Sequence, residues 1–250
     1  MSLAGKRIVN TRAVHQAPEL DTRLRAEGAI PLAYPCITIL PPDDTSALDQ
    51  ALAKRAFDLL VLTSANAVLI LAQRLEALGL SFAGVRAAAV GAATARAAGE
   101  ALGVEIVLVP DEYTADALAE ALGVAPGMRI LLPQSEIARP QLTRRLRQRG
   151  AEVTALTAYR TVRGSGGVDL VARLRDRQVD VVTFASASTV LHFVARLASE
   201  GGKMTDVPIA CIGGPTSRSA RECGFSVAVE ARPHTLDGLI TGLAAYFREN

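Results

Sequence analysis

The sequence contains no tryptophan, and aromatic residues make up only 4% of its 250 residues. Such a chain has few rings to stack on bases, and its net charge of +2 provides no general basic surface, so we expect no binding to nucleic acid. No apolar run approaches the roughly 20 residues that a membrane-spanning helix needs, so we expect no membrane association. No stretch typical of a signal peptide is found near the first residue, which predicts a cytoplasmic location.

Cysteine and histidine are also scarce, with three of each. The cysteines are scattered and odd in number, which argues against a disulfide framework or a zinc site and fits a reducing cytoplasm. Of the histidines, His192 falls inside an expected helix and is interpreted as structural. His15 and His234 lie near expected strand-to-helix turns, where a ligand role stays open. Glycine-rich phosphate loops and the common hydrolase motifs are missing from the sequence.

What the sequence does contain is a strand-to-helix turn that occurs twice, 122 residues apart. Gly91 and Thr94 of the first copy correspond to Gly213 and Thr216 of the second. Each copy is a short apolar run, a glycine, and a threonine that opens a helical pattern, which favours an anion at the helix start. The same offset relates Arg7 to Arg129, Asp58 to Asp180 and Ser64 to Ser186. A repeat of this length predicts a duplicated α/β module.

Strands and helices are expected to alternate along both repeats, which predicts parallel sheets with ligands at the carboxyl ends of the strands. The apolar run 57–62 is typical of a parallel strand covered on both faces, and a strand is also expected over 180–184. Two extended stretches, 34–42 and 157–163, occupy equivalent positions in the repeats. The first is bracketed by prolines and predicts an exposed ribbon or linker. The glycine-rich segment 164–167 predicts the most flexible point of the chain.

Hydroxyl side chains follow several expected strands and precede or begin helices: Thr11, Ser64, Thr94, Ser135, Ser186, Thr216 and Thr235. Capping of the next helix is the simplest interpretation of each one. Capping and ligand binding are compatible, because the same helix ends offer backbone donors to carboxylates. Several such ends around one cleft would bind a polyanion without a strongly basic surface. Tyr159, one of only four tyrosines, lies in the second extended stretch. It is interpreted either as an amphipathic hinge residue or as a functional residue.

The order and spacing of these motifs resembles the uroporphyrinogen-III synthase family over nearly the whole chain. The matching segments are 10–12, 57–68, 90–94, 150–153, 159–161, 181–186 and 212–217. The chain departs from the family pattern at Ala13, where proline usually follows the arginine, and at Ala92 and Ala93 in the first turn.

The resemblance implies an α/β fold of two flavodoxin-like parallel-sheet domains that are joined by a two-stranded β-ladder linker. Domain one would comprise residues 1–33 with 165–250, the linker 34–41 with 157–164, and domain two 42–156. The chain would leave the first domain, build the second and return, so that each domain mixes both repeats. The active site is expected in the cleft between the domains.

The resemblance also implies a reaction. The linear tetrapyrrole hydroxymethylbilane loses hydroxide, its ring D is inverted through a spiro intermediate, and uroporphyrinogen III closes without a metal or an organic cofactor. We expect Tyr159 to give a proton to the leaving hydroxyl, because a phenol keeps its proton at neutral pH. The expected carboxylate-binding residues are Thr11, Arg12, Ser64, Thr94, Ser135, Ser186, Gly213, Thr216 and Thr235. We expect a monomer that also contacts hydroxymethylbilane synthase transiently.

Two other classes of protein stay open at this point. A two-domain α/β protein with a cleft is also the shape of a non-catalytic small-molecule-binding protein, which would bind the bilane and release it unchanged. A nucleotide- or flavin-dependent enzyme on flavodoxin-like domains is weakened by the missing phosphate loop, but a fold alone does not decide function.

Overall fold

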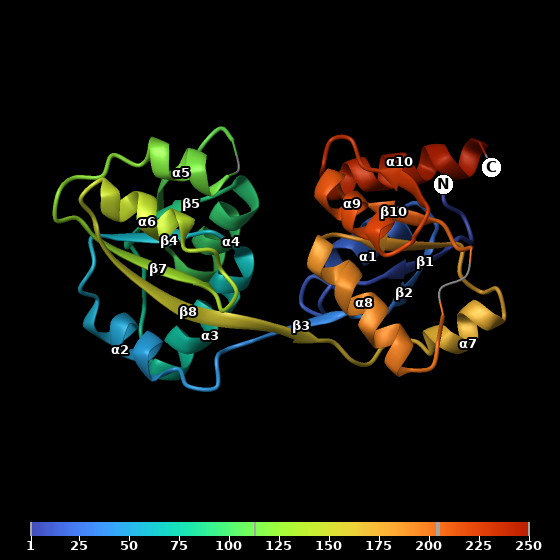
Figure 1. Ribbon diagram of the computed structural model, residues 1–250, viewed down its shortest axis with the longest axis horizontal. Coiled ribbons are helices and arrows are strands. Elements are labelled where there is room, and N and C mark those ends of the chain that lie inside the picture. The colour runs from blue at the N-terminus through green and yellow to red at the C-terminus, as the bar shows by residue number, and fades with distance from the viewer. Residues whose placement is uncertain (1, 113, 204–205, 250) are drawn as a thin grey trace. The chain divides into compact units, whose positions relative to one another are not determined.

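The computed structural model describes residues 2–112, 114–203 and 206–249 (Figure 1). The chain forms two compact units, the first made of Met1–Thr38 with Val162–Asn250 and the second of Ile39–Thr161. Each unit contains a sheet of parallel strands that alternate with helices. The α/β fold with two parallel sheets is therefore as the sequence predicts.

The sheet of the first unit has five parallel strands in the order β11-β10-β9-β1-β2. In chain order they are β1 (Arg7–Asn10), β2 (Ile30–Ala33), β9 (Val181–Phe184), β10 (Ile209–Cys211) and β11 (Val227–Glu230). The helices are α1 (Ala17–Ala26), α7 (Leu170–Arg175), α8 (Ala187–Ser199), α9 (Gly214–Glu222) and α10 (Leu236–Glu249). When these five strands are counted 1 to 5 along the chain, their order in the sheet is the flavodoxin-like 2-1-3-4-5. The chain reverses direction across the sheet between β1 and β9.

Helices cover both faces of this sheet because their apolar residues recur every three or four positions. Leu20 and Leu24 of α1 pack with Leu239 and Leu243 of α10 against one face. The other face is covered by an aromatic and aliphatic cluster that includes Phe193 of α8. Each leucine that is fully buried in this way contributes about 1.5–3 kcal/mol to folding.

The sheet of the second unit has six strands in the order β3-β8-β7-β4-β5-β6. In chain order they are β3 (Ile37–Leu40), β4 (Leu59–Leu62), β5 (Arg86–Ala89), β6 (Glu105–Leu108), β7 (Arg129–Ser135) and β8 (Glu152–Arg163). The helices are α2 (Ser46–Lys54), α3 (Ala65–Leu78), α4 (Ala92–Leu102), α5 (Ala115–Ala121) and α6 (Gln141–Gln148). Apart from β3, the order counted along the chain is 3-2-1-4-5, which becomes 2-1-3-4-5 when β7 and β8 are counted before β4. The chain reverses direction across the sheet between β7 and β4.

Each sheet combines strands of the two sequence repeats. The first strand of each repeat pairs with a later strand of the other repeat: β1 pairs with β9, and β7 pairs with β4. Matched ion pairs join these strands: the Nη2 atom of Arg7 lies 2.9 Å from Asp180 Oδ1, and that of Arg129 lies 2.6 Å from Asp58 Oδ1. Each arginine of the matched pair Arg7 and Arg129 thus contacts the matched aspartate of the other repeat.

The crossing segment 34–42, predicted as an exposed ribbon or linker, is largely buried, so the predicted exposure is wrong. Tyr34 and Cys36 lie in the core of the first unit. The Tyr34 ring meets Phe193 edge to face at 5.7 Å, and the guanidinium of Arg196 lies 3.8 Å from its centre. In the second crossing segment, residues 157–163 continue the strand that begins at Glu152, which makes β8 12 residues long.

Close packing, rather than flexibility, explains the glycine-rich segment 164–167. A β-carbon at Gly164 would stand 2.2 Å from Pro35 O, and one at Gly167 would stand 2.1 Å from Ala33 O. Both distances are far inside van der Waals contact, so glycine is required for the backbones to approach. The segment is also hydrogen-bonded to the incoming chain, since Gly164 N–H donates to Cys36 O at 2.9 Å.

The matched ion pairs predict how stability depends on pH. Hydrogen bonds from Arg129 lower the pKa of Asp58 to about 2, and hydrogen bonds from Arg7 lower the pKa of Asp180. A carboxyl with a lowered folded pKa stabilises the fold above its unfolded pKa of about 4, and this contribution is lost as the pH falls through the folded value. For Asp58 the window therefore runs from about pH 4 to about pH 2.

We expect Asp58→Asn and Asp180→Asn to lower the melting temperature at neutral pH and to approach the wild type as the pH falls through this window. The effect of Asp180→Asn is expected to be larger, because Arg7 and Asp180 are 31% and 25% exposed against 49% and 42% for Arg129 and Asp58. Thermal melts across this pH range measure both effects, with the exposed acid Asp111 changed to Asn as the control. A melting-temperature difference that does not vary with pH would contradict the assignment.

Candidate functional site

Three predicted residues meet at the carboxyl end of the second unit's sheet. Ser64 follows β4, Ser135 ends β7, and Tyr159 lies on β8, so they come from three adjacent strands. The Tyr159 hydroxyl donates a hydrogen bond to Ser64 Oγ at 3.2 Å. The β7–β4 boundary is the point at which open parallel sheets bind ligands, because the loops on its two sides diverge there.

A bulge in β8 places the Tyr159 side chain. The register pairs Gln134 with Thr157 and then Ser135 with Tyr159, so Ala158 is an extra residue on β8. A bulge of this kind turns the next side chain away from its regular direction, and bulges are frequent beside active sites. The backbone there is held by Glu136 N–H, which donates to Tyr159 O at 2.9 Å. Tyr159 as a whole is 8% exposed, so most of its side chain is packed within the second unit.

Ser64 caps α3 and still has a proton to donate. Its Oγ accepts from Asn66 N–H at 3.0 Å and from Tyr159. A serine hydroxyl has two acceptor positions and one donor. No described residue accepts a hydrogen bond from Ser64, so its O–H can serve a substrate or a charged neighbour.

Ser135 and Thr94 complete the predicted groups of the second unit. Ser135 Oγ accepts from Ile137 N–H at 3.4 Å, in the loop that follows β7. Thr94 lies in the first turn of α4 and is buried. The first hydrogen bond of α4 runs from Ala95 N–H to Gly91 O, which leaves the preceding amides without partners inside the helix.

In the first unit, hydroxyl groups gather where α8 begins after β9. Ser186 Oγ caps the helix by accepting from Thr189 N–H at 3.2 Å. The same atom lies 3.0 Å from Ser188 Oγ and 2.7 Å from Thr189 Oγ1. Sequence reasoning missed Ser188 and Thr189 as members of this group, although three hydroxyl residues within four positions at a helix start were a visible signal.

Thr11 and Arg12 follow β1, the strand beside β9, and so lie on the other side of the β1–β9 boundary. The Thr11 side chain is fully buried and its hydroxyl donates to Thr183 O at 2.6 Å, which gives it a structural role. Arg12 makes an ion pair with Glu19 at 3.2 Å. Its Nε atom is buried, and none of the described residues accepts a hydrogen bond from it. A buried donor without a partner is costly, so this N–H is suited to an anionic ligand.

The second copy of the repeated turn begins α9. Gly213 precedes this helix and Thr216 is buried in its first turn. The ring of His234 covers the turn, because a β-carbon at Gly213 would stand 3.0 Å from it. Thr235 caps α10 by accepting from Gly238 N–H at 3.1 Å. Glu230 approaches Gly214, and its negative charge makes this turn less favourable for an anion than the first copy.

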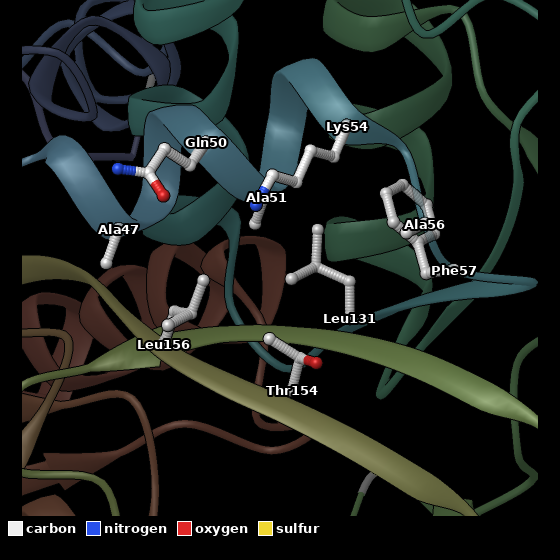
Figure 2. A pocket seen from close by; sticks show the side chains of 9 residues that line it. All are labelled: Ala47, Gln50, Ala51, Lys54, Ala56, Phe57, Leu131, Thr154 and Leu156. Carbon is white, nitrogen blue, oxygen red and sulfur yellow. The ribbon is translucent and has the colours of Figure 1, made fainter.

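A cavity of about 280 Å³ lies elsewhere in the second unit, between α2 and the strands β7 and β8 (Figure 2). Leu131, Thr154 and Leu156 form its sheet side, and Ala51 and Lys54 belong to its helix side. The small alanine side chains of α2 leave this space. None of the predicted residues lines it, so the carboxyl ends of the sheets remain the candidate site.

Residues 2–112, 114–203 and 206–249 contain no group of three or more His, Cys, Asp or Glu side chains placed to hold a metal ion. Within the same ranges, none of the helices is both long and apolar enough to span a membrane.

The fold and these groups define a class: two-unit α/β proteins with hydroxyl and amide groups gathered where parallel strands end and helices begin. The family model described as uroporphyrinogen-III synthase HemD matches residues 18–241. A uroporphyrinogen-III synthase from Synechococcus elongatus is 36% identical over 259 residues, covering 99% of this chain and 97% of the relative. The chain therefore belongs to the uroporphyrinogen-III synthase family, as the order of its motifs predicts. It is accordingly an enzyme of tetrapyrrole biosynthesis.

Solved structures agree on the fold. A mutant uroporphyrinogen III synthase from Thermus thermophilus aligns with a TM-score of 0.63 and 23% identity, covering 98% of this chain and 100% of that one. The corresponding enzyme from Helicobacter pylori aligns with a TM-score of 0.61 and 14% identity, covering 96% and 98%.

Proposed function

We propose that the chain converts hydroxymethylbilane to uroporphyrinogen III with inversion of ring D, and that Tyr159 is its proton donor. The observation that carries the assignment of Tyr159 is its hydrogen bond to Ser64 at the β7–β4 boundary. The reaction itself is inferred from the membership of the chain in the uroporphyrinogen-III synthase family.

The pair can move one proton without any other group. As the C–O bond of the hydroxymethyl carbon breaks, the Tyr159 proton passes to the leaving oxygen and water departs. The phenolate that forms accepts a hydrogen bond from Ser64 O–H, the donor that the free site leaves unused. A charge-assisted hydrogen bond of this kind is about twice as strong as a neutral one. When the macrocycle closes, the substrate loses a proton, and this proton restores the phenol.

The other predicted groups would hold the acetate and propionate side chains. In the second unit these are Ser135 and the amides at the start of α4 beside Thr94. In the first unit they are Arg12 Nε, the Ser186 group, the Gly213–Thr216 turn and Thr235. We propose that both units bind the same substrate and act as the two domains. Catalysis then consists largely of holding the bilane so that inversion is faster than direct closure.

We also propose that the protein acts in the cytoplasm as a monomer and receives its substrate through transient contact with hydroxymethylbilane synthase. Free bilane closes to the type I isomer without an enzyme, so a short transfer would preserve it. A monomer predicts a single sedimenting species of 26.2 kDa. A stable dimer at micromolar concentration would contradict this part of the proposal.

The reaction is tested by the isomer of the product. Purified protein is given freshly made hydroxymethylbilane, the product is oxidised, and type I and type III uroporphyrins are separated. We expect type III to dominate, because only ring inversion produces it. Type I alone, formed at the rate without protein, would overturn the proposed function.

The role of Tyr159 is tested by Tyr159→Phe. We expect kcat to fall by about 100-fold, the lower end of the effect of general acid catalysis, with residual type III product from substrate orientation. Tyr246→Phe is the matched control. Tyr246 lines a hollow with Lys6 and Asp180, which precede β1 and β9 and so mark the amino end of the first unit's sheet, away from the carboxyl ends where the proposed substrate-binding groups lie. Wild-type turnover by Tyr159→Phe would remove the residue from the mechanism.

A further inference from the structure

Ile137 and Val14 are the two most exposed large aliphatic side chains in the described parts of the chain. Ile137 is 80% exposed and Val14 is 67% exposed. Single exposed aliphatic residues are common on protein surfaces and carry no meaning alone. The position of these two in the duplicated fold is what distinguishes them.

Both residues occupy the loop after the first strand of a repeat. Val14 follows β1 and Ile137 follows β7, the two strands that correspond at the offset of 122. These loops adjoin the boundaries between β1 and β9 and between β7 and β4, where parallel sheets of this order bind ligands. The next most exposed aliphatic residue, Leu191 at 58%, stands five positions after Ser186 on α8.

Backbone hydrogen bonds fix both loops beside the proposed substrate-binding groups. Ile137 N–H donates to Ser135 Oγ at 3.4 Å, and the neighbouring Glu136 N–H donates to Tyr159 O at 2.9 Å. Ile137 is thus tied to both the bulged strand and the serine. Val14 lies between Arg12, whose N–H donates to Asn10 Oδ1 at 3.1 Å, and Gln16, whose N–H donates to Ala13 O at 2.8 Å.

We propose that Ile137 and Val14 are positioning residues that pack against pyrrole rings of the bilane, an inference that rests on the proposed function. The substrate alternates apolar rings with acidic side chains. Hydroxyl and amide donors bind the acids but leave the ring faces in water. An aliphatic side chain held beside these donors covers a ring face and restricts its rotation about the methylene bridges. Ring contacts therefore affect both binding and the choice of isomer.

The test compares Ile137→Ser and Val14→Ser with two matched controls. Ile30→Ser removes a 49% exposed isoleucine at the amino end of β2, and Val107→Ser removes a 37% exposed valine from β6. We expect KM to rise by about 10-fold in Ile137→Ser, which corresponds to the loss of roughly 60 Å² of apolar contact. Val14→Ser should raise KM by a smaller factor because valine is smaller, and both should increase the type I fraction. The controls should stay within about twofold of the wild type.

Melting temperatures of both site variants should match the wild type, since neither side chain is buried, and Ile137→Leu should restore KM. If the wild type forms only type I product, the proposed function itself fails. If the wild type forms type III and both site variants behave like the controls, the function stands and the ring contacts are wrong. Equal increases of KM in site and control variants would also overturn the ring contacts.

Discussion

A single buried guanidinium, that of Arg196, holds both segments through which the chain leaves and re-enters the first unit. Its N–H groups donate to Pro35 O and Gly166 O at 2.7 Å each and to Glu200 at 2.8 Å, while its face lies against the Tyr34 ring. Tyr34 in turn donates to Glu200 at 2.9 Å. A buried charge is tolerated only when its partners are complete, so the two segments and α8 are interdependent. The outgoing and returning segments of the first unit therefore share one anchor.

The chain leaves the first unit after β2 and returns to it after β8, which explains how a duplicated sequence builds two sheets that each contain strands of both repeats. Each repeat supplies two strands to one sheet and the rest to the other, and the ion pairs Arg7–Asp180 and Arg129–Asp58 mark the junctions. The point where the strand order reverses therefore always lies between strands of different repeats. This is why the proposed substrate-binding groups on its two sides come from distant parts of the sequence. The exposed Ile137 and Val14 likewise lie in the loops that follow the corresponding strands β7 and β1.

The candidate site was partly visible in the sequence. Ser64, Ser186 and Thr235 cap helices as their positions before helical patterns indicated, and the same positions put them at the carboxyl ends of strands. Thr11 follows a strand in the same way, yet its hydroxyl turns inward to Thr183. The direction of a side chain at the end of a strand depends on the strand beside it, which local pattern does not specify.

The sequence by itself determined the alternation of strands and helices, because apolar periodicity and turn residues act over a few positions. It also determined the duplication, from residues that match at an offset of 122, and the family, from the order of the motifs. Only the tertiary structure decided the bulge at Ala158, which exists relative to β7, and with it the approach of Tyr159 to Ser64. It also decided the burial of Tyr34 and the need for glycine at position 164, which depend on Arg196 and Pro35. These features arise from contacts between residues far apart in the chain, where register and packing, rather than local preference, set the geometry.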